Sequence, residues 1–558
     1  MKQYIIKFII IACSLVLCMA VHAQEESFQL HGTVTDESGR PLAGITVSTA
    51  DGRDATVTDH EGRYTLGMVT RRTEILYSAP GFRPLKTEVD DLKESVTLQA
   101  AGSYDCNEQV YLGYTSQRAG ELSGAVSRVT GDQLQKSPVT NLSMALAGRL
   151  PGLFTSESNS EPFRTSTNLY VRGVSSIRGN QPIVIIDGTV IGYNTISVLD
   201  NITPAEIESI SVLKDASVQA LYGIQGGDGV IVVTTRRGTR TPFRMNVRFD
   251  QTFQQRSTEP AFIGSAEYAE LRNQAARNDG LGDNYYYSDE EIGKFRSGED
   301  RELYPENNWR DMFLRDVSHM QRLGFDLQYG NDKVRFYTNI NLLHQGGFYH
   351  TDDSRDYKPN NNNFGVNFRS NADVKLNKYL TGSLRLAGNI RREKTPGGGA
   401  LGTIYEQLLY RAPTVYGPVT PEQVDPQTGE VIQEGGGVIV TDKLTNAPYG
   451  MINRMGYIQR TGTNIYAQFQ LDLDMSFLTP GLGMNGSIAY HINSSNNLVA
   501  SQTYQRWIRS SNTPEPAFEK YGTAVDGALT YGKTYNMFHQ MTYQCMIHYD
   551  RAFGRHRV

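Results

Sequence analysis

The chain has 558 residues and a formal net charge of −5 at pH 7, with 54 glycines and 32 tyrosines. It is too long for one ordinary domain core, and its charge gives no indication of nucleic-acid binding. Beyond the N-terminus, no apolar run reaches the length of a membrane helix. A membrane is not excluded, because strands of a transmembrane barrel alternate apolar and polar residues and have a weak hydropathy signal.

The N-terminus has the pattern of an export signal. Lys2 and Lys7 flank the start of an apolar segment, residues 8–21, and small residues follow up to Ala23. A basic start, a short apolar core and small residues at the cleavage site are typical of a secretory signal peptide. We therefore expect residues 1–23 to be removed on export.

The cysteines are few and isolated. Cys13 and Cys18 lie in the signal segment, and Leu17 stands where a lipoprotein signal requires a small residue, so we expect no lipid anchor. Cys106 and Cys545 are too far apart in sequence to define a disulfide framework or a metal site, and whether they pair stays open. No cofactor is expected.

Residues 27–100 are predicted to form a small β domain. Phe28, Leu30 and Val34 fall on one face of an alternating run, and turn sequences follow at residues 36–41. Short strands separated by regular turns favour a seven-stranded, Ig-like sandwich. The Asp-rich turns fit calcium loops or, more simply, solvated β-turns, and no zinc-ligand spacing is present.

Residues 102–120 form a polar linker around a short β-prone segment. This segment, together with the acidic residue before it, consists of Glu108, Gln109, Val110, Tyr111, Leu112, Gly113 and Tyr114. An extended, unpaired strand can add to the edge of a partner's sheet through main-chain hydrogen bonds. An ordinary linker strand is the alternative interpretation.

Residues 121–240 are predicted to form a small α/β domain without a catalytic cluster. The apolar run 183–186 leads into Asp187-Gly188, a pair that favours a tight hairpin. Thr203 and Glu206 have the spacing of a helix capping box. A glycine-rich turn then leads into a last apolar strand.

From residue 243 onward, alternating segments have the length of tilted membrane strands. We expect eight of them, at residues 243–254, 321–329, 334–343, 364–374, 380–390, 464–477, 482–492 and 536–549. The long stretches 261–315 and 395–460 fit external loops that meet ligand. Their aromatic residues either stack on a sugar or peptide or pack the loop against itself; they are Tyr285, Tyr286, Tyr287 and Trp309.

Several sequence motifs occur in one order: LAGRLPGL, VRG, PIVIIDG, ITPAEIESISVLKDASVQALYG and GVIVVTT. They resemble the plug of a TonB-dependent outer-membrane transporter of the SusC/RagA-like type, the starch-utilisation C proteins of Bacteroidetes. Within them the plug-motif positions are Arg172, Gly173, Asp187, Gly188, Lys214, Asp215, Gly223 and Gly229. The upstream strings HGTVTDESGRPLAGITV and TDHEGRYTL are similar to the carboxypeptidase-regulatory-like domain of the same family.

The resemblance implies a mainly β protein: a β-sandwich, an α/β plug and the first strands of a large antiparallel transmembrane β-barrel. It implies that residues 109–114 are the TonB box, although the family usually has valines where Tyr111 and Leu112 stand. The implied partners are TonB with its ExbB/ExbD energy complex, a SusD-like substrate-binding lipoprotein, outer-membrane lipid, and an oligosaccharide or peptide ligand. No enzymatic activity is implied.

Charged plug residues allow two interpretations. Arg149, Arg172, Arg178 and Lys214 with Asp215 either contact the barrel wall or form structural ion pairs within the plug. The sequence alone does not decide between them.

Eight strands close around an interior only wide enough for side chains, whereas plugged transporters need about 22. We therefore expect residues 243–558 to be a partial barrel. The rival interpretations are a surface glycan-binding adhesin scaffold, a non-functional truncated transporter and a secreted hydrolase; the last lacks any motif spacing.

Overall fold

The computed structural model describes residues 27–36, 38–71, 73–92, 95–100, 108–159, 166–174, 181–192, 195–258, 260–281, 287–352, 355–398, 401–425, 427–510, 517–553 and 556–557. The predicted signal peptide, Cys106, Arg178, Tyr285 and Tyr286 lie outside these residues. Cys545 is a free, exposed cysteine.

The N-terminal domain is a sandwich of two sheets with seven strands, as predicted. One sheet has the order β4-β1-β7, with bounds Arg63–Val69, Phe28–Thr35 and Ser95–Thr97; the other has the order β3-β2-β5-β6, with bounds Ala55–Val57, Thr46–Thr49, Glu74–Ser78 and Leu85–Glu88. Val34, Leu66 and Ile75 are fully buried between the sheets, as the alternation in the sequence requires.

The plug domain is built on a mixed five-stranded sheet in the order β10-β15-β16-β13-β14, with bounds Val126–Thr130, Ile207–Leu213, Val230–Thr235, Ile183–Ile186 and Thr189–Val190. A separate hairpin pairs β11 (Leu153–Asn159) with β12 (Ser166–Val171). Short helical segments surround the sheet: α2 (Gly131–Leu134), α3 (Leu142–Ala145), α4 (Thr195–Leu199), α5 (Ala216–Gln219) and the 3-10 turns Pro204–Glu206 and Ala220–Gly226.

Two local predictions for the plug are confirmed. Asp187 and Gly188 have φ values of 47° and 85° at the tip of the β13–β14 hairpin. The Thr203–Glu206 capping box is formed, with both of its hydrogen bonds present. In both cases side-chain chemistry local to a few residues decides the backbone conformation.

All eight predicted barrel strands are present in one antiparallel sheet, in chain order. They are β17 (Arg244–Gln255), β18 (Val317–Gly330), β19 (Val334–Gly346), β20 (Asn362–Lys375), β21 (Leu380–Pro396), β25 (Gly456–Asp474), β26 (Leu482–Ser501) and β29 (Thr530–Tyr549). Several extend beyond the predicted ends; β26 continues through the polar run Ser494–Asn497, where no apolar alternation marks a strand. Among the described residues, β17 and β29 are the two edges of this sheet.

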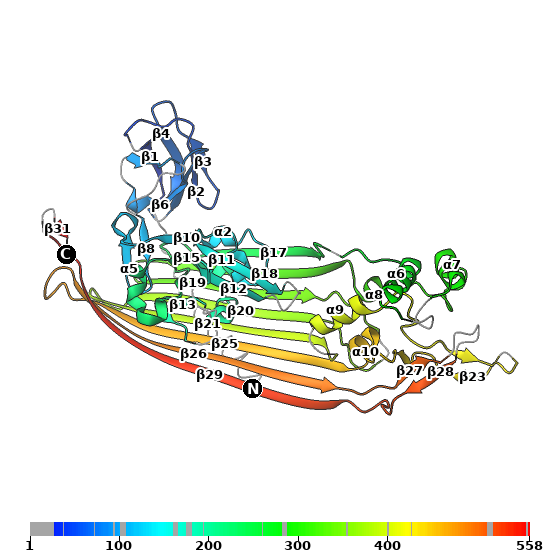
Figure 1. Ribbon diagram of the computed structural model, residues 1–558. Helices are drawn as coiled ribbons and strands as arrows, with labels where there is room; N and C mark the ends of the chain where they lie inside the picture. Colours follow the sequence, from blue (N-terminus) through cyan, green and yellow to red (C-terminus); the bar gives the residue numbers. More distant parts are fainter. Residues whose placement is uncertain are drawn as a thin grey trace.

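The two faces of the eight-stranded sheet differ in polarity. Asn341, Asn367 and Asn389 lie on the face toward the plug, whereas Phe368 and Ile390 are exposed on the opposite face. Polar residues toward the lumen and apolar residues outward are the pattern of a transmembrane barrel. Figure 1 shows the curved sheet with the plug against it near the end that carries the sandwich.

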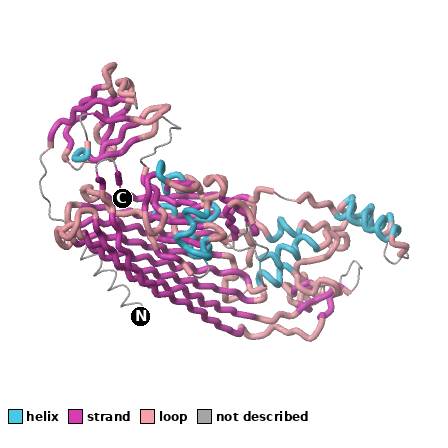
Figure 2. Tube along the Cα trace, turned by 60° about the vertical axis from the view of Figure 1, so that its left-hand side comes forward, coloured by secondary structure: helices cyan, strands magenta, loops and turns pink. Residues whose placement is uncertain are grey.

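The long loops fold into a cluster at the other end of the sheet (Figures 1 and 2). Its helices are α6 (Ser265–Asn278), α7 (Asp289–Ser297), α8 (Trp309–Phe313), α9 (Leu401–Tyr410) and α10 (Pro448–Asn453). Short strands accompany them: β22 (Gln423–Val424) with β23 (Val431–Gln433), and β24 (Val438–Ile439) with β27 (Arg506–Arg509) and β28 (Phe518–Tyr521). A last small pair joins β30 (Ala552–Phe553) to β31 (His556–Arg557).

Trp309 packs against neighbouring residues of the loop cluster. It is buried, stacks on Phe313 at 6.4 Å between ring centroids and donates its indole N–H to the carbonyl oxygen of Ala412 at 2.9 Å. Tyr287 is partly buried beside Phe295. For these two aromatic residues, packing of the loop against itself is the correct alternative.

In the described part of the chain, no helix is long and apolar enough to cross a membrane. No group of three or more His, Cys, Asp or Glu residues there is arranged to hold a metal ion.

Candidate coupling site and plug interface

The β-prone segment of the linker is a hairpin and not a free strand. β8 (Gln109–Tyr111) pairs antiparallel with β9 (Ser116–Arg118), and the turn between them includes Gly113 at φ 98°. The prediction that this segment is initially unpaired is therefore wrong. The physical reason is that Val110 and Leu112 are apolar, and burial against the plug removes them from water.

The hairpin packs on one face of the plug sheet. Val110 and Leu112 belong to a buried cluster with Ile185, Leu213 and Tyr222. The hydroxyl of Tyr222 donates a hydrogen bond to the carbonyl oxygen of Leu112. The ring of Tyr222 also lies 5.0 Å from that of Tyr114.

Two glycines allow the hairpin to approach the plug closely. A side chain at Gly113 would collide with the hydroxyl of Tyr222, and one at Gly188 would lie 3.1 Å from the carbonyl oxygen of Gly113. The tip of the plug hairpin β13–β14 therefore contacts the turn of the linker hairpin. Burial in this contact raises the pKa of Tyr111 to about 12.

One edge of β8 remains available for pairing. Leu112 donates its N–H to the carbonyl oxygen of Thr115, and Ala119 donates to that of Glu108, each at 2.8 Å. Because antiparallel pairs alternate, the main-chain groups of Gln109 and Tyr111 point away from β9. Among the described residues, β8 pairs with no other strand.

The same plug hairpin is bound to the barrel wall by uncharged side chains. Gln544 of β29 donates to the carbonyl oxygen of Gly188 at 2.9 Å, and Tyr466 of β25 donates to Thr189 Oγ1 at 2.9 Å. Gln540 of β29 donates to the carbonyl oxygen of Val190 at 3.0 Å. These bonds join the hairpin that contacts the linker to strands far away in sequence.

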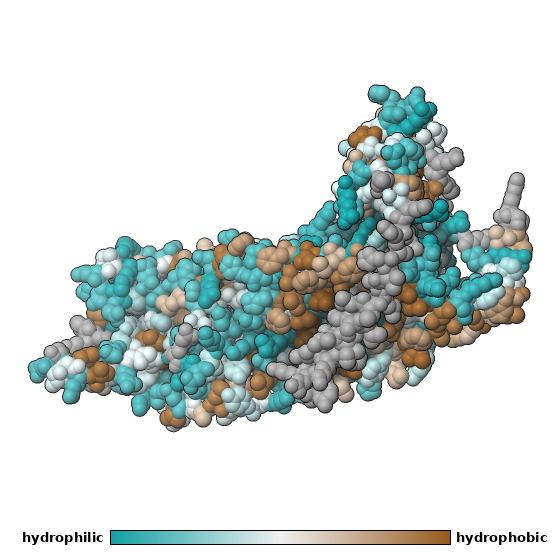
Figure 3. All heavy atoms as spheres, turned by 180° about the vertical axis from the view of Figure 1, so that it is seen from behind, coloured by the Kyte–Doolittle hydropathy of each residue, from teal (hydrophilic) through white to brown (hydrophobic). Residues whose placement is uncertain are grey.

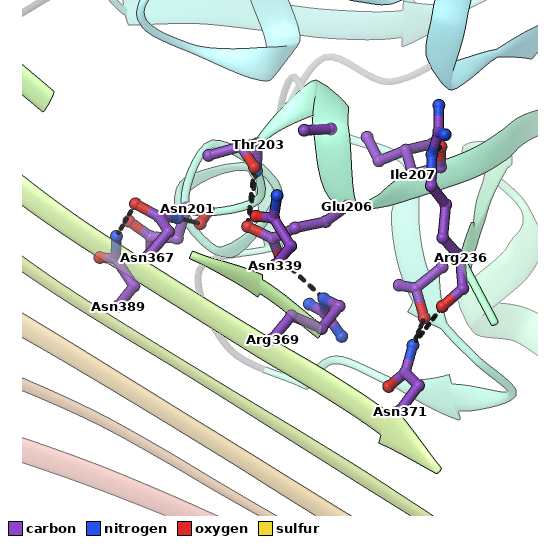
Figure 4. A network of polar contacts seen from close by, with 12 residues as sticks. Asn201, Thr203, Glu206, Ile207, Arg236, Asn339, Asn367, Arg369, Asn371 and Asn389 are labelled. Atoms are coloured by element: carbon purple, nitrogen blue, oxygen red, sulfur yellow. Dashed lines mark hydrogen bonds and ion pairs between the residues drawn. The ribbon is translucent and has the colours of Figure 1, made fainter. Parts of the chain in front are cut away.

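A buried ion pair crosses the interface between plug and wall. Arg369 Nε of β20 lies 2.7 Å from Glu206 Oε2 of the plug, and both side chains are 3% exposed. Asn371 donates to Thr235 Oγ1 at 2.8 Å and to the carbonyl oxygen of Arg236 at 2.7 Å. Figure 4 shows these contacts side by side.

A ladder of asparagines continues this interface across neighbouring strands. Residues in direct register on five successive strands are Asn341, Asn367, Asn389, Asn464 and Asn493. Asn341 donates to Thr203 Oγ1 at 3.2 Å, and Asn367 donates to the carbonyl oxygen of Asn201. Sequence reasoning missed this ladder, because the residues align only when the strand register is known.

The described members of the charged set singled out from the sequence make contacts within the plug. Arg172 Nη2 lies 2.6 Å from Asp215 Oδ1, and Lys214 donates to Ser127 Oγ at 2.7 Å. Arg149 donates to Ser137 Oγ at 2.7 Å. Among the described residues, these contacts agree with the second interpretation, in which the charges bind within the plug; Arg178 lies outside the described residues.

The remaining plug-motif glycines take conformations that favour glycine. Gly173, Gly223 and Gly229 have φ values of 101°, 57° and 102°. A side chain on Gly229 would also collide with Val171. Their role is to shape the plug backbone.

The sandwich is attached to the barrel by an ion pair. Glu74 Oε2 of the sandwich lies 2.8 Å from Arg244 Nη1, at the start of the first barrel strand, and 2.9 Å from Lys86 Nζ. Glu74 is buried. This contact fixes the sandwich at the end of the sheet where the linker hairpin lies.

Two family profiles match the chain. The TonB-dependent Receptor Plug Domain matches residues 118–230, and the Carboxypeptidase regulatory-like domain matches residues 29–108. Together with the plug packed on a sheet of membrane-barrel pattern, they define the class of protein as a TonB-dependent receptor.

Relatives narrow this class. TonB-dependent receptor P26 of Formosa agariphila is 30% identical over 373 residues, which cover 66% of this chain and 34% of the relative. TonB-dependent receptor SusC of Bacteroides thetaiotaomicron is 29% identical over 225 residues, 39% of this chain and 22% of SusC. The chain thus spans about a third, or less, of the length of these curated relatives.

Solved structures agree on the fold. The RagAB peptide importer in its 'open-open' state matches with a TM-score of 0.58 at 17% identity, over 80% of this chain and 47% of the other. The 'closed-closed' state matches with a TM-score of 0.55 at 16% identity, over 77% of this chain and 46% of the other. The two profiles and the curated relatives together support a SusC/RagA-like TonB-dependent receptor.

Proposed function

We propose that the complete protein imports a large nutrient across the outer membrane, driven by TonB, and that residues 109–114 are the segment that TonB binds. The observation that carries this proposal is the free edge of β8. It lies on a hairpin that contacts the plug, and the plug hairpin beneath it is bound to the barrel wall. A partner strand added at this edge would act directly on the plug.

The ligand class in this proposal is an oligosaccharide or a peptide. RagAB, which shares the fold, is described as a peptide importer. By analogy we propose a SusD-like lipoprotein partner over the folded loops, at the end of the sheet away from the sandwich. In this proposal the protein moves the ligand and does no bond chemistry on it, in keeping with its similarity to TonB-dependent receptors.

The test uses the full-length receptor in its native membrane. Gln109→Pro removes a main-chain donor from the free edge of β8 while leaving the hydrogen bonds between β8 and β9 in place. We expect uptake to fall about tenfold or more, since each lost main-chain bond leaves a partner group unpaired. Ligand binding and surface abundance should persist.

Gln109→Ala is the matched control, because it removes the same side chain and keeps the N–H. Proline at Val110 or Leu112 is less selective, since these residues carry the bonds within the hairpin. Normal uptake by Gln109→Pro would remove the free edge of β8 from the mechanism. An adhesin without transport would lose nothing in any of these variants.

A further inference from the structure

The loop cluster contains a pocket outside the plug interface. It has a volume of about 420 Å³ and lies between the segment before β18 and the segment after α9. Its lining includes Phe262, Glu306, Trp309, Arg310 and Arg411. Figure 3 shows mostly hydrophilic side chains toward the loop end on the face in view.

Arg411 is the unusual residue of this pocket. Its side chain is buried, with 4% of the residue exposed. Nη2 donates to the carbonyl oxygen of Ile439 at 3.0 Å, but Nε and Nη1 have no hydrogen-bond partner among the described residues. A buried guanidinium with two unsatisfied donors is costly, and an acceptor that reaches these donors would remove that cost.

The surroundings of Arg411 stabilise its charged guanidinium without supplying an opposite charge. Its guanidinium carbon lies 4.9 Å from the ring of Trp309, an arrangement that is attractive for a cation. Burial lowers the pKa of Arg411 to about 10, so the group stays protonated at neutral pH.

The other charged residues of the lining are paired with opposite charges, so the net positive charge of the pocket comes from Arg411. Arg310 lines it and lies 5.4 Å from the ring of Phe262. Arg310 pairs with Asp311 at 2.9 Å. The acidic residue of the lining, Glu306, is paired with Arg301 at 2.6 Å. Arg411 is therefore the lining cation whose described surroundings include no carboxylate partner.

We propose that this pocket binds the oxyanion group, a carboxylate or a sulfate, of an acidic ligand, with Arg411 as the main contact and Arg310 beside it. The planar guanidinium matches the two oxygens of such a group and binds them with charge-assisted hydrogen bonds. The proposal adds to the proposed import function by naming the charge of the substrate. It rests on that function only in the step that carries the bound ligand across the membrane.

The test is calorimetric titration of the full-length receptor in detergent. Four probes separate the sources of the oxyanion: a galacturonate tetramer, a sulfated neutral tetrasaccharide, an acidic tetrapeptide and unmodified maltotetraose. We expect at least one acidic probe to bind at least tenfold more tightly than maltotetraose, and the one that does so identifies the chemistry. Equal affinity for all four, or no binding of any acidic probe, would overturn the proposal.

Variants then assign the binding to the pocket. Arg411→Gln should weaken the acidic probe about tenfold or more, since it removes a charged hydrogen-bond donor, while Arg411→Lys should recover part of the loss. Arg296→Gln is the matched control, because Arg296 is an exposed cation of the same loop cluster that pairs with Glu270 outside the pocket. A loss as large in this control would mean that general charge is responsible.

Folding and function are separated by two further measurements. If thermal unfolding shows that Arg411→Gln is destabilised, Arg310→Gln must by itself weaken the acidic probe at least threefold, and an unchanged affinity would overturn the proposal. An acidic probe that binds through Arg411 to a receptor that does not import it supports the pocket and contradicts transport. If Arg411→Gln imports that probe as well as the wild type does, the result supports transport and contradicts binding through the pocket.

Discussion

The hydroxyl of Tyr222 donates a hydrogen bond to the main-chain carbonyl oxygen of Leu112, more than a hundred residues earlier in the chain. This bond joins the linker hairpin to the 3-10 turn before the last plug strand. Together with the contact between Gly113 and Gly188, it keeps the hairpin against the plug. The proposed TonB-binding segment is thus part of the plug surface at rest.

The Tyr222→Phe variant should loosen this hairpin. It removes the hydrogen bond and keeps the ring beside Tyr114. A hydrogen bond of this kind contributes about 0.5 to 1.5 kcal/mol, so we expect the opened population to rise about twofold to tenfold. Hydrogen exchange of residues 109–114 in the full-length receptor measures it, with Tyr170→Phe as a control elsewhere on the plug. Equal exchange in both variants would contradict the prediction.

Alanine at Gly188 should displace the hairpin, whereas alanine at Gly173 should not. Both glycines have positive φ, so both substitutions carry backbone strain of about 1 kcal/mol. Only the new side chain at Gly188 meets the carbonyl oxygen of Gly113; at Gly173 nothing lies within 4 Å. Faster exchange of residues 109–114 in Gly188→Ala alone would support the contact, and the same increase in both would attribute it to strain.

Breaking the buried ion pair should destabilise the plug. Glu206→Gln or Arg369→Met leaves one buried charge without its partner, which costs about 3 to 5 kcal/mol. The double variant should be less destabilised than the sum of the two single variants, because no lone charge remains. Hydrogen exchange of β15 in the full-length receptor reports this local stability. Additive effects would show that the two residues act independently.

Plug stability should depend on pH through Asp200. Burial raises the pKa of Asp200 to about 6, and the side chain accepts a hydrogen bond from the N–H of Ser143. An unfolded aspartate titrates near pH ~3.9, so the folded protein keeps its proton over a range where the unfolded chain loses it. The stabilisation is complete below about pH 4 and is lost as the pH rises through about 6.

Thermal unfolding of the full-length receptor between pH 4 and pH 7 tests this dependence. Asp200→Asn keeps the acceptor for Ser143 and removes the titration. We expect the unfolding temperature of the wild type to fall over this range relative to that of Asp200→Asn, by the equivalent of about 2 to 3 kcal/mol. Parallel curves for the two proteins would contradict the prediction.

The parts of the fold that sequence reasoning predicted depend on local chemistry. The Asp187-Gly188 turn, the Thr203–Glu206 cap and the alternation of the eight barrel strands each follow from residues close together in the chain. The linker strand was identified, but its pairing was not. Nothing within residues 109–114 indicates that Tyr222 and Ile185 lie beneath them.

The interface between plug and wall could not be predicted for a related reason. Glu206 serves a local cap through Oε1 and a distant arginine through Oε2, and only the cap has a sequence pattern. The asparagine ladder requires the register of neighbouring strands whose paired residues are up to 75 positions apart, as Asn389 and Asn464 are. Charged residues with prominent motifs, such as Arg172 and Lys214, bind within the plug instead.

The position of the Gly188 contact has a mechanical consequence. The hairpin tip is bound to the wall by Gln544, whereas the Glu206–Arg369 pair lies elsewhere on the plug. A force applied at residues 109–114 reaches the tip bonds first, so the plug should peel away bond by bond instead of shearing from the wall at once. Removal of the plug from the wall should therefore need less force when the full-length receptor is pulled at Gln109 than when it is pulled at Arg236. Single-molecule stretching would measure this difference in force.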